Sequence, residues 1–248
     1  MKILNLNQFN EKMKIVPLSD DDFSKIPDNL YKYHPETKEG LTSIIYERIQ
    51  KDGKECNLND IDVSKITDMS YLFAKHDNSV RNSISNFNGD ISGWNVSNVT
   101  NMSSMFSGAE SFNQDIGGWD VSNVKYMNGM FKNAKSFNSD LSGWDVTNVE
   151  DMKFMFCGAE SFNRNLSKWN VSNVRNMSYM FKFAGSFDCD ISRWDISKVE
   201  SMIEMFCYAR SFKRDLSGWD VSSVQYATDM FDGCPLFNQP EKQPKFNI

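Results

Sequence analysis

Hydrophobic residues recur along most of the chain at a fixed interval of 25 residues. Each unit opens with a phenylalanine, has a tryptophan seven residues later and carries a second phenylalanine in its latter half. The six tryptophans of the chain are Trp94, Trp119, Trp144, Trp169, Trp194 and Trp219. A fixed period of this length is typical of stacked structural repeats, in which each unit buries the hydrophobic side chains of its neighbours.

The pattern of hydrophobic and polar positions changes within a unit. Trp94 and Val96 alternate with polar residues, which is typical of a short strand with one buried face. The hydrophobic residues that follow have the spacing of a short amphipathic helix. They are Val99, Met102, Met105, Phe106 and Ala109. We therefore predict an α/β repeat, a right-handed solenoid with one short strand and one short helix in each 25-residue coil.

The repeats divide the chain into five regions. Residues 87–236 hold six 25-residue repeats, and residues 56–74 hold a degenerate first repeat. Residues 75–86 are polar and exceed the repeat length, which predicts an inserted surface loop. Residues 1–55 are expected to form a small N-terminal cap over the first coil, and residues 237–248 a C-terminal tail.

The capping segment is expected to contain a helix. Pro35 lies near its start and Gly53 lies where it would end. Its hydrophobic face consists of Leu41, Ile44, Ile45 and Ile49.

The repeat consensus FNxDxSxWDVSNVxxMxxMF and the preceding stretch LNDIDVSKITDMSYLF resemble the BspA-like leucine-rich-repeat surface-protein family, which is also widespread in mycoplasma lipoproteins. The resemblance covers about Asn57 to Asn238, most of the chain. It implies a leucine-rich-repeat-like solenoid, with adhesion and protein binding as the usual suggested roles. It provides no catalytic residues to transfer.

Composition excludes several kinds of partner. The net charge is −6, and the basic residues are scattered rather than clustered, which argues against a nucleic-acid partner. No hydrophobic run has the length of a membrane span, and the N-terminal stretch MKILNLNQFNEKMK does not resemble a signal peptide. The expected location is therefore the cytoplasm or export by a signal-independent route, whereas the resemblance suggests the cell surface.

Thiols and histidines give little basis for catalysis. The five cysteines are expected to be free thiols, as in a reducing compartment. They are Cys56, Cys157, Cys189, Cys207 and Cys234. The chain has two histidines. Cys56 as nucleophile and His76 as base would be one catalytic pair, but nothing supplies an oxyanion hole. We therefore expect no enzyme, and a cysteine hydrolase is the weakest alternative.

Acidic residues recur at one position of the repeat. They are Asp90, Asp115, Asp140, Asp190 and Asp215. Stacked carboxylates would repel one another, and such a column suggests a calcium-dependent adhesion or scaffold protein. Asn165 occupies the same position, however, so the shared property is a short hydrogen-bond acceptor suited to turns. We expect this structural role and no cofactor, with calcium as the alternative.

The tryptophans and the repeated methionines are expected to lie in the core, because the tryptophans alternate with polar residues and the methionines follow the hydrophobic face of the predicted helix.

Function is expected where the repeat sequence varies. One variable strip holds Lys125, Tyr126, Glu150, Arg175, Glu200 and Tyr226. A second set has aromatic residues at positions that hold Ser, Gly or Asn in other repeats, and consists of Phe154, Tyr179, Phe183 and Tyr208. Exposed aromatic residues on a rigid scaffold are candidate binding hot spots, although they could also pack only on their neighbours. We predict a non-enzymatic protein-interaction or adhesion module with an unidentified protein partner.

Overall fold

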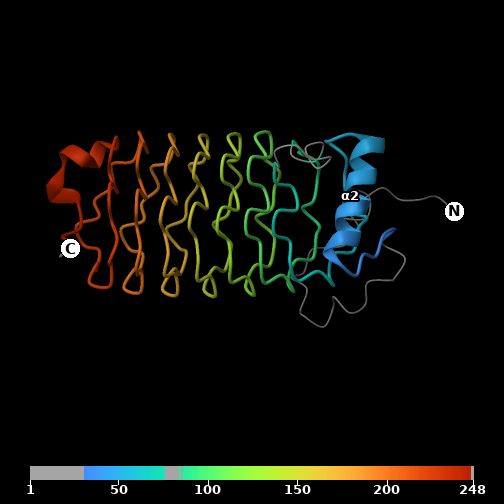
Figure 1. Ribbon diagram of the computed structural model, residues 1–248, viewed down its shortest axis with the longest axis horizontal. Coiled ribbons are helices and arrows are strands. Elements are labelled where there is room, and N and C mark those ends of the chain that lie inside the picture. The colour runs from blue at the N-terminus through green and yellow to red at the C-terminus, as the bar shows by residue number, and fades with distance from the viewer. Residues whose placement is uncertain (1–30, 76–83, 85, 247–248) are drawn as a thin grey trace, which may run out of the picture.

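A computed structural model describes residues 31–75, 84 and 86–246 of the chain (Figure 1). Successive repeats form irregular coils that lie side by side along the long axis of the molecule (Figure 1). Helix α2 (Lys38–Asp52) lies at one end of this row, and two short 3-10 helices, η3 (Pro235–Asn238) and η4 (Pro240–Lys242), lie at the other. The first 30 residues of the predicted cap and most of the predicted inserted loop lie outside the described residues.

The predicted α/β solenoid, with its strand and helix in each coil, is wrong. Within the described residues α2 is the one α-helix, and no β-sheet forms. Each repeat contributes a single residue to a row of isolated parallel β-bridges. The row runs through Asp68, Asn101, Tyr126, Asp151, Asn176, Ser201 and Tyr226. The chain is mainly irregular, so the leucine-rich-repeat-like architecture implied by the resemblance does not apply.

Tight turns replace the predicted helix. The N–H of Met130 donates to the carbonyl of Met127, and the N–H of Ala134 to that of Phe131, at a spacing of three residues rather than the four of an α-helix. Gly129 and Asn133 lie between these contacts with φ angles of 65° and 56°. A left-handed residue interrupts a right-handed helix, so the segment cannot continue as one.

Half of the backbone amides in this segment bind the neighbouring repeat instead. The N–H of Phe131 donates to the carbonyl of Met155 at 2.9 Å, and the N–H of Asn133 donates to that of Cys157 at 2.7 Å. Alternate amides therefore close turns within one coil and join two coils together. This arrangement satisfies the backbone without a regular element.

The stretch predicted as a strand also consists of turns. The N–H of Trp119 donates to the carbonyl of Ile116, and the N–H of Val124 donates to that of Val121. Trp119 and Val121 are buried while Asp120 between them is exposed, so the alternation of burial was predicted correctly and its strand geometry was not.

Phenylalanine side chains fill the core as two stacked columns. The rings of Phe106 and Phe131 are parallel with centroids 5.7 Å apart, and those of Phe112 and Phe137 are 6.0 Å apart. Within one repeat the two columns meet, with 4.0 Å between the centroids of Phe106 and Phe112. All of these side chains are completely buried. Such ring stacks require equivalent residues of adjacent repeats to lie directly over one another.

The tryptophans and methionines lie in the core, as predicted. Each tryptophan is at most 5% exposed, and Met102, Met105 and their equivalents are buried. The indole N–H of Trp144 donates to the backbone carbonyl of Ile116 in the preceding repeat at 3.0 Å. Each of the other five tryptophans makes the equivalent bond to a backbone carbonyl of the coil that precedes its own. Tryptophan therefore contributes ring area and a specific link between repeats.

Helix α2 forms where the sequence predicts it. The side chain of Thr37 accepts the N–H of Gly40 at its start, and Gly53 with φ 86° ends it. Leu41, Ile45 and Ile49 are buried against the first coil as part of the same core. At the opposite end of the molecule, Leu236 of η3 is fully buried.

We predict that Trp144→Phe lowers the free energy of unfolding by about 1–3 kcal/mol, because the buried carbonyl of Ile116 loses its hydrogen-bond donor. Urea denaturation followed by circular dichroism measures the change. Tyr126→Phe is the control, since this side chain is 45% exposed. An equal change in the two variants would contradict a specific role for the indole N–H.

Candidate partner-binding surface

The four aromatic candidate residues occupy left-handed backbone positions. Their φ angles are 60° for Phe154, 63° for Tyr179, 58° for Phe183 and 57° for Tyr208. The equivalent residues of the other repeats are also left-handed, and they are Ser104, Gly129, Glu204 and Asp229 for Phe154 and Tyr179, and Gly108, Asn133, Gly158 and Gly233 for Phe183 and Tyr208. A left-handed conformation costs a side-chain-bearing residue about 1–2 kcal/mol. The chain therefore places bulky rings where its own backbone favours glycine.

The four rings stack in two pairs at the surface. Phe154 and Tyr179 have centroids 4.4 Å apart and planes 11° apart, and Phe183 and Tyr208 have centroids 5.3 Å apart. Phe154 and Tyr179 are half-buried, whereas Phe183 and Tyr208 are 47% and 40% exposed. The rings therefore pack on one another and still leave a large aromatic area in solvent.

Three lysines lie over the faces of these rings. The ammonium of Lys132 is 4.8 Å from the centroid of Phe154. Lys153 lies over Phe154 and Tyr179, and Lys182 lies over Tyr179 and Phe183, at 5.1 to 5.8 Å. These are cation–π distances. We call the three lysines and four rings the aromatic–lysine surface.

Glu204 borders this surface and forms an ion pair with Lys182. The hydrogen bond between them raises the pKa of Lys182 and lowers that of Glu204. The lysines were not predicted from the sequence. Lys132 and Lys182 share one repeat position, and Lys153 occupies another. Lys153 and Lys182 directly precede Phe154 and Phe183 in the sequence, whereas the contacts of Lys132 with Phe154 and of Lys153 with Tyr179 are made between stacked coils.

The predicted charged strip lies along two shallow hollows. Lys125, Glu150 and Arg175 line one hollow of about 380 Å³, and Arg175 and Glu200 line a second of about 460 Å³. Arg175 Nη1 and Glu200 Oε1 are 2.8 Å apart, and both side chains are largely exposed. The structure therefore brings these four charged candidates together.

The two tyrosines of the strip are separate from each other. Tyr126 and Tyr226 are both exposed members of the β-bridge row, but three further bridge residues stand between them. They do not form one aromatic patch.

The repeated Asp and Asn residues accept hydrogen bonds in turns. Asp140 Oδ1 accepts the N–H of Ser142 at 2.9 Å, and Asn165 Oδ1 accepts that of Ser167 at the same distance. This confirms the structural role predicted for the column. In the part of the chain that the structure describes, no three His, Cys, Asp or Glu side chains lie together in a group that could hold a metal ion. The calcium alternative gains no support.

All five cysteines are free thiols, as predicted. Cys56 is buried, and this burial raises the pKa of its thiol, which disfavours the nucleophilic thiolate. His76, the base considered for Cys56, lies outside the described residues. Among the helices of the described ranges, none is long and apolar enough to cross a membrane.

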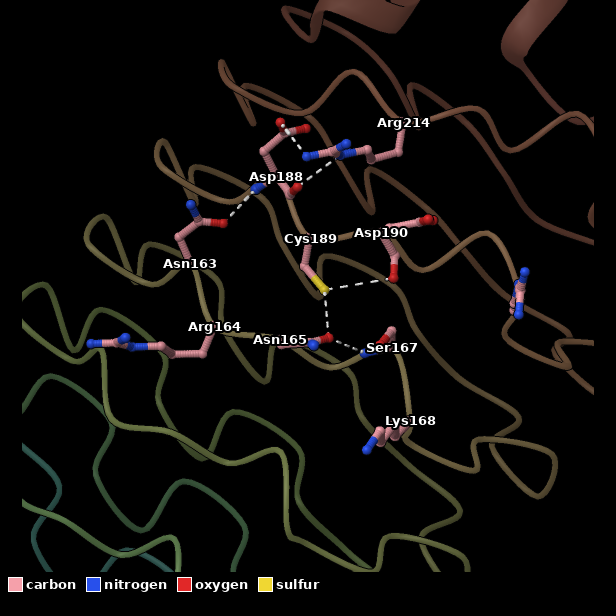
Figure 2. Close-up of a pocket in the computed structure, with 10 residues that line it drawn as sticks. Asn163, Arg164, Asn165, Ser167, Lys168, Asp188, Cys189, Asp190 and Arg214 are labelled. Carbon is pink, nitrogen blue, oxygen red and sulfur yellow. Dashed lines mark hydrogen bonds and ion pairs between the residues drawn. The ribbon is translucent and has the colours of Figure 1, made fainter.

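A surface pocket of about 600 Å³ surrounds Cys189 (Figure 2). The thiol Sγ accepts the backbone N–H of Leu166 at 3.1 Å, and burial raises the pKa of the thiol. Arg164, Lys168, Arg193 and Arg214 are among the lining residues. The pocket was not predicted from the sequence, although Lys168 and Arg193 replace glycines of the other repeats and so mark its position.

The molecule is thus a repeat protein whose variable residues gather on the surface of stacked coils. It belongs to the family described as "Mycoplasma protein of unknown function, DUF285", which matches residues 43–156 and 141–243. The resemblance to mycoplasma repeat proteins is confirmed at this level. Comparisons with curated proteins and with solved structures gave no match.

We predict that Phe183→Gly changes the free energy of unfolding by less than about 1 kcal/mol, because relief of left-handed strain offsets the lost ring stack. Phe181→Ala in the core should cost about 3–5 kcal/mol. Urea denaturation of both variants tests this. A loss at Phe183 as large as that at Phe181 would show that the Phe183 ring is part of the core.

We predict that acid destabilises the protein through the Asp column. Hydrogen bonds from Ser142 lower the pKa of Asp140, and those from Ser192 and Ser217 lower the pKa values of Asp190 and Asp215. A lowered folded-state pKa contributes stability that is present above the unfolded value of about 3.9 and is lost as the pH falls through the folded value.

Thermal unfolding from neutral pH to acid pH measures this effect. The triple variant Asp140→Asn, Asp190→Asn and Asp215→Asn should keep its melting temperature at neutral pH, because Asn165 makes the same turn. Its melting temperature should fall less steeply in acid than that of the native chain. Identical acid profiles would refute the assignment.

Proposed function

We propose that this protein is a non-enzymatic interaction module that binds a protein partner through the aromatic–lysine surface. The observation that carries the proposal is the placement of four rings at left-handed positions, with lysine ammonium groups over the faces of three of them, Phe154, Tyr179 and Phe183. Strain retained in a structure is a reason to look for function at that place. The resemblance to BspA-like surface proteins, with their suggested roles in adhesion and protein binding, supports the same proposal.

The backbone beneath the rings favours binding at low entropic cost. The N–H of Phe154 donates to the carbonyl of Ser178, and the N–H of Phe183 donates to that of Cys207, in each case in the next repeat. Tyr179 and Tyr208 make equivalent bonds. Rings on a backbone that is hydrogen-bonded to the next repeat lose little further freedom on binding, so more of the contact energy remains for affinity.

The chemistry of the surface favours an acidic partner segment with apolar or aromatic side chains. Lys132, Lys153 and Lys182 place three positive charges there, with Glu204 paired to Lys182 and Asp151 near Lys153, in a chain with a net charge of −6. Carboxylates of the partner would meet the lysines, and its apolar groups would cover Phe183 and Tyr208. Aromatic residues of this kind are enriched among interface hot spots.

We predict that the variant Phe154→Gly, Tyr179→Gly, Phe183→Gly and Tyr208→Gly folds but loses its partner, because glycine suits each backbone position and removes each ring. Immobilised native and variant proteins are used to capture partners from extracts of source cells, and the captured partner is purified for affinity measurement. Affinity should fall at least tenfold in the variant and should weaken with added salt.

The control variant is Tyr126→Asn and Tyr226→Asn, which removes exposed rings elsewhere and introduces the residue found at Asn101 and Asn176. It should bind like the native chain. Equal loss of affinity in the two variants, or unchanged affinity in the glycine variant, would contradict the proposed surface.

A further inference from the structure

The pocket around Cys189 lies where a short side chain stands between two long ones in the stack of coils. Arg164 and Arg214 occupy the same repeat position in the two neighbouring coils, and the cysteine between them leaves a hollow of about 600 Å³. Figure 2 shows Cys189 between the Asp188–Arg214 pair and Asn165. The hollow lies on a different part of the repeat from the aromatic–lysine surface, so it is independent of the function proposed above.

Three departures from the repeat sequence coincide at this pocket. Lys168 and Arg193 stand before the tryptophans of two adjacent repeats, where the other four repeats have glycine. Asn165 replaces the aspartate that all five other repeats have at its position. Each change makes the lining more positive, and all of them fall on residues that line the same hollow.

The lining has a net positive charge in an acidic protein. It contains four basic and two acidic side chains, for a net charge of +2, whereas the whole chain carries −6. Asp188 is neutralised by Arg214, with 3.0 Å between the guanidinium and the carboxylate. Asp190 accepts the backbone N–H of Ser192 at 3.0 Å. Both carboxylates therefore already interact with groups of the protein.

Two of the basic residues remain available to a ligand. The guanidinium of Arg164 is turned to the preceding repeat, where its Nε donates to the carbonyl of Asn138 at 2.6 Å. Lys168 and Arg193, by contrast, form no side-chain hydrogen bond or ion pair within the described ranges 31–75, 84 and 86–246, and Arg193 has only a longer-range Coulombic attraction to Asp190. Both side chains line the hollow.

Neutral donors complete the lining. The amide oxygens of Asn163 and Asn165 accept the backbone N–H groups of Asp188 and Ser167. Their amide NH₂ groups are thereby left to donate. Ammonium, guanidinium and amide donors around a hollow are the groups that bind phosphate oxygens.

We propose that the Cys189 pocket binds a small molecule through a doubly charged phosphomonoester group, with Lys168 and Arg193 as its charge partners. The charge of the lining matches such a dianion, which carries about −1.5 to −2 near neutral pH. Asn163 and Asn165 donate to its remaining oxygens. The thiol of Cys189 takes no chemical part and serves to leave the space open.

Thermal shift and calorimetric titration of the full chain test this proposal, with inorganic phosphate, sulfate and glycerol 3-phosphate as probes at constant ionic strength. Glycerol 3-phosphate should raise the melting temperature, because a ligand that binds the folded state stabilises it. Inorganic phosphate should bind more weakly, since it fills less of the hollow. Stabilisation by sulfate equal to that by both phosphates would show a general anion effect and overturn the phosphomonoester assignment, as would the absence of any shift.

Three variants separate the pocket from general charge. Lys168→Gly with Arg193→Gly restores the glycines of the other repeats and should weaken binding by about tenfold or more. Lys125→Gln with Lys198→Asn removes the same charge at another hollow and should leave binding unchanged. Cys189→Arg adds a positive charge but fills the pocket, and it should abolish binding. Tighter binding by Cys189→Arg, or equal loss in the two double variants, would refute the site.

Discussion

The hydrogen bonds between coils are the constraint on which the rest of the structure depends. Alternate amides of the segment after the β-bridge donate to carbonyls of the next repeat, as Phe131 does to Met155. An insertion within this segment would shift the donors beyond it away from their acceptors, and the unpaired groups would be buried. The additional residues at 75–86 lie outside the segment, and Met69, Tyr71 and Phe73 still donate to the second coil. The constraint therefore accounts for the constant length of this segment in the six repeats. The same register places phenylalanine over phenylalanine and each indole N–H against the carbonyl of the coil before it.

Sequence analysis identified the period, the buried positions, the helix before Gly53 and the turn role of the Asp column, because these depend on the side chains alone. It failed on backbone geometry. Consecutive three-residue turns repeat hydrophobic residues at the same interval as one face of a helix, so Met127 and Met130 fit both. The left-handed backbone at Gly129 and Asn133 excludes the helix and leaves the turns. Glycine would indicate such a backbone in the sequence, but other repeats have a different residue at the position of Gly129, as at Phe154.

The candidate surfaces could be predicted only in part, for a different reason. Phe154, Tyr179, Phe183 and Tyr208 stood out as departures within single columns of the repeat, and they do lie together. The lysines over their faces and the residues around Cys189 belong to several columns. Lys153 and Lys182 adjoin Phe154 and Phe183 in the sequence, but the contacts between coils depend on which columns are neighbours across two coils. The turns determine this arrangement, and the sequence pattern did not specify them.

In a repeat of this kind, the residues that stabilise the fold are different from those that vary on the surface. The aromatic stacks and indole bonds involve inward-facing positions that barely vary, so outward positions can change without disturbing the register. A single outward change gives an isolated surface side chain. When adjacent repeats change in neighbouring columns, as with Lys168, Cys189 and Arg193, the coils stack those changes into one site. Sites in this architecture should therefore be sought where departures from the consensus coincide in consecutive repeats, rather than where any one residue is unusual.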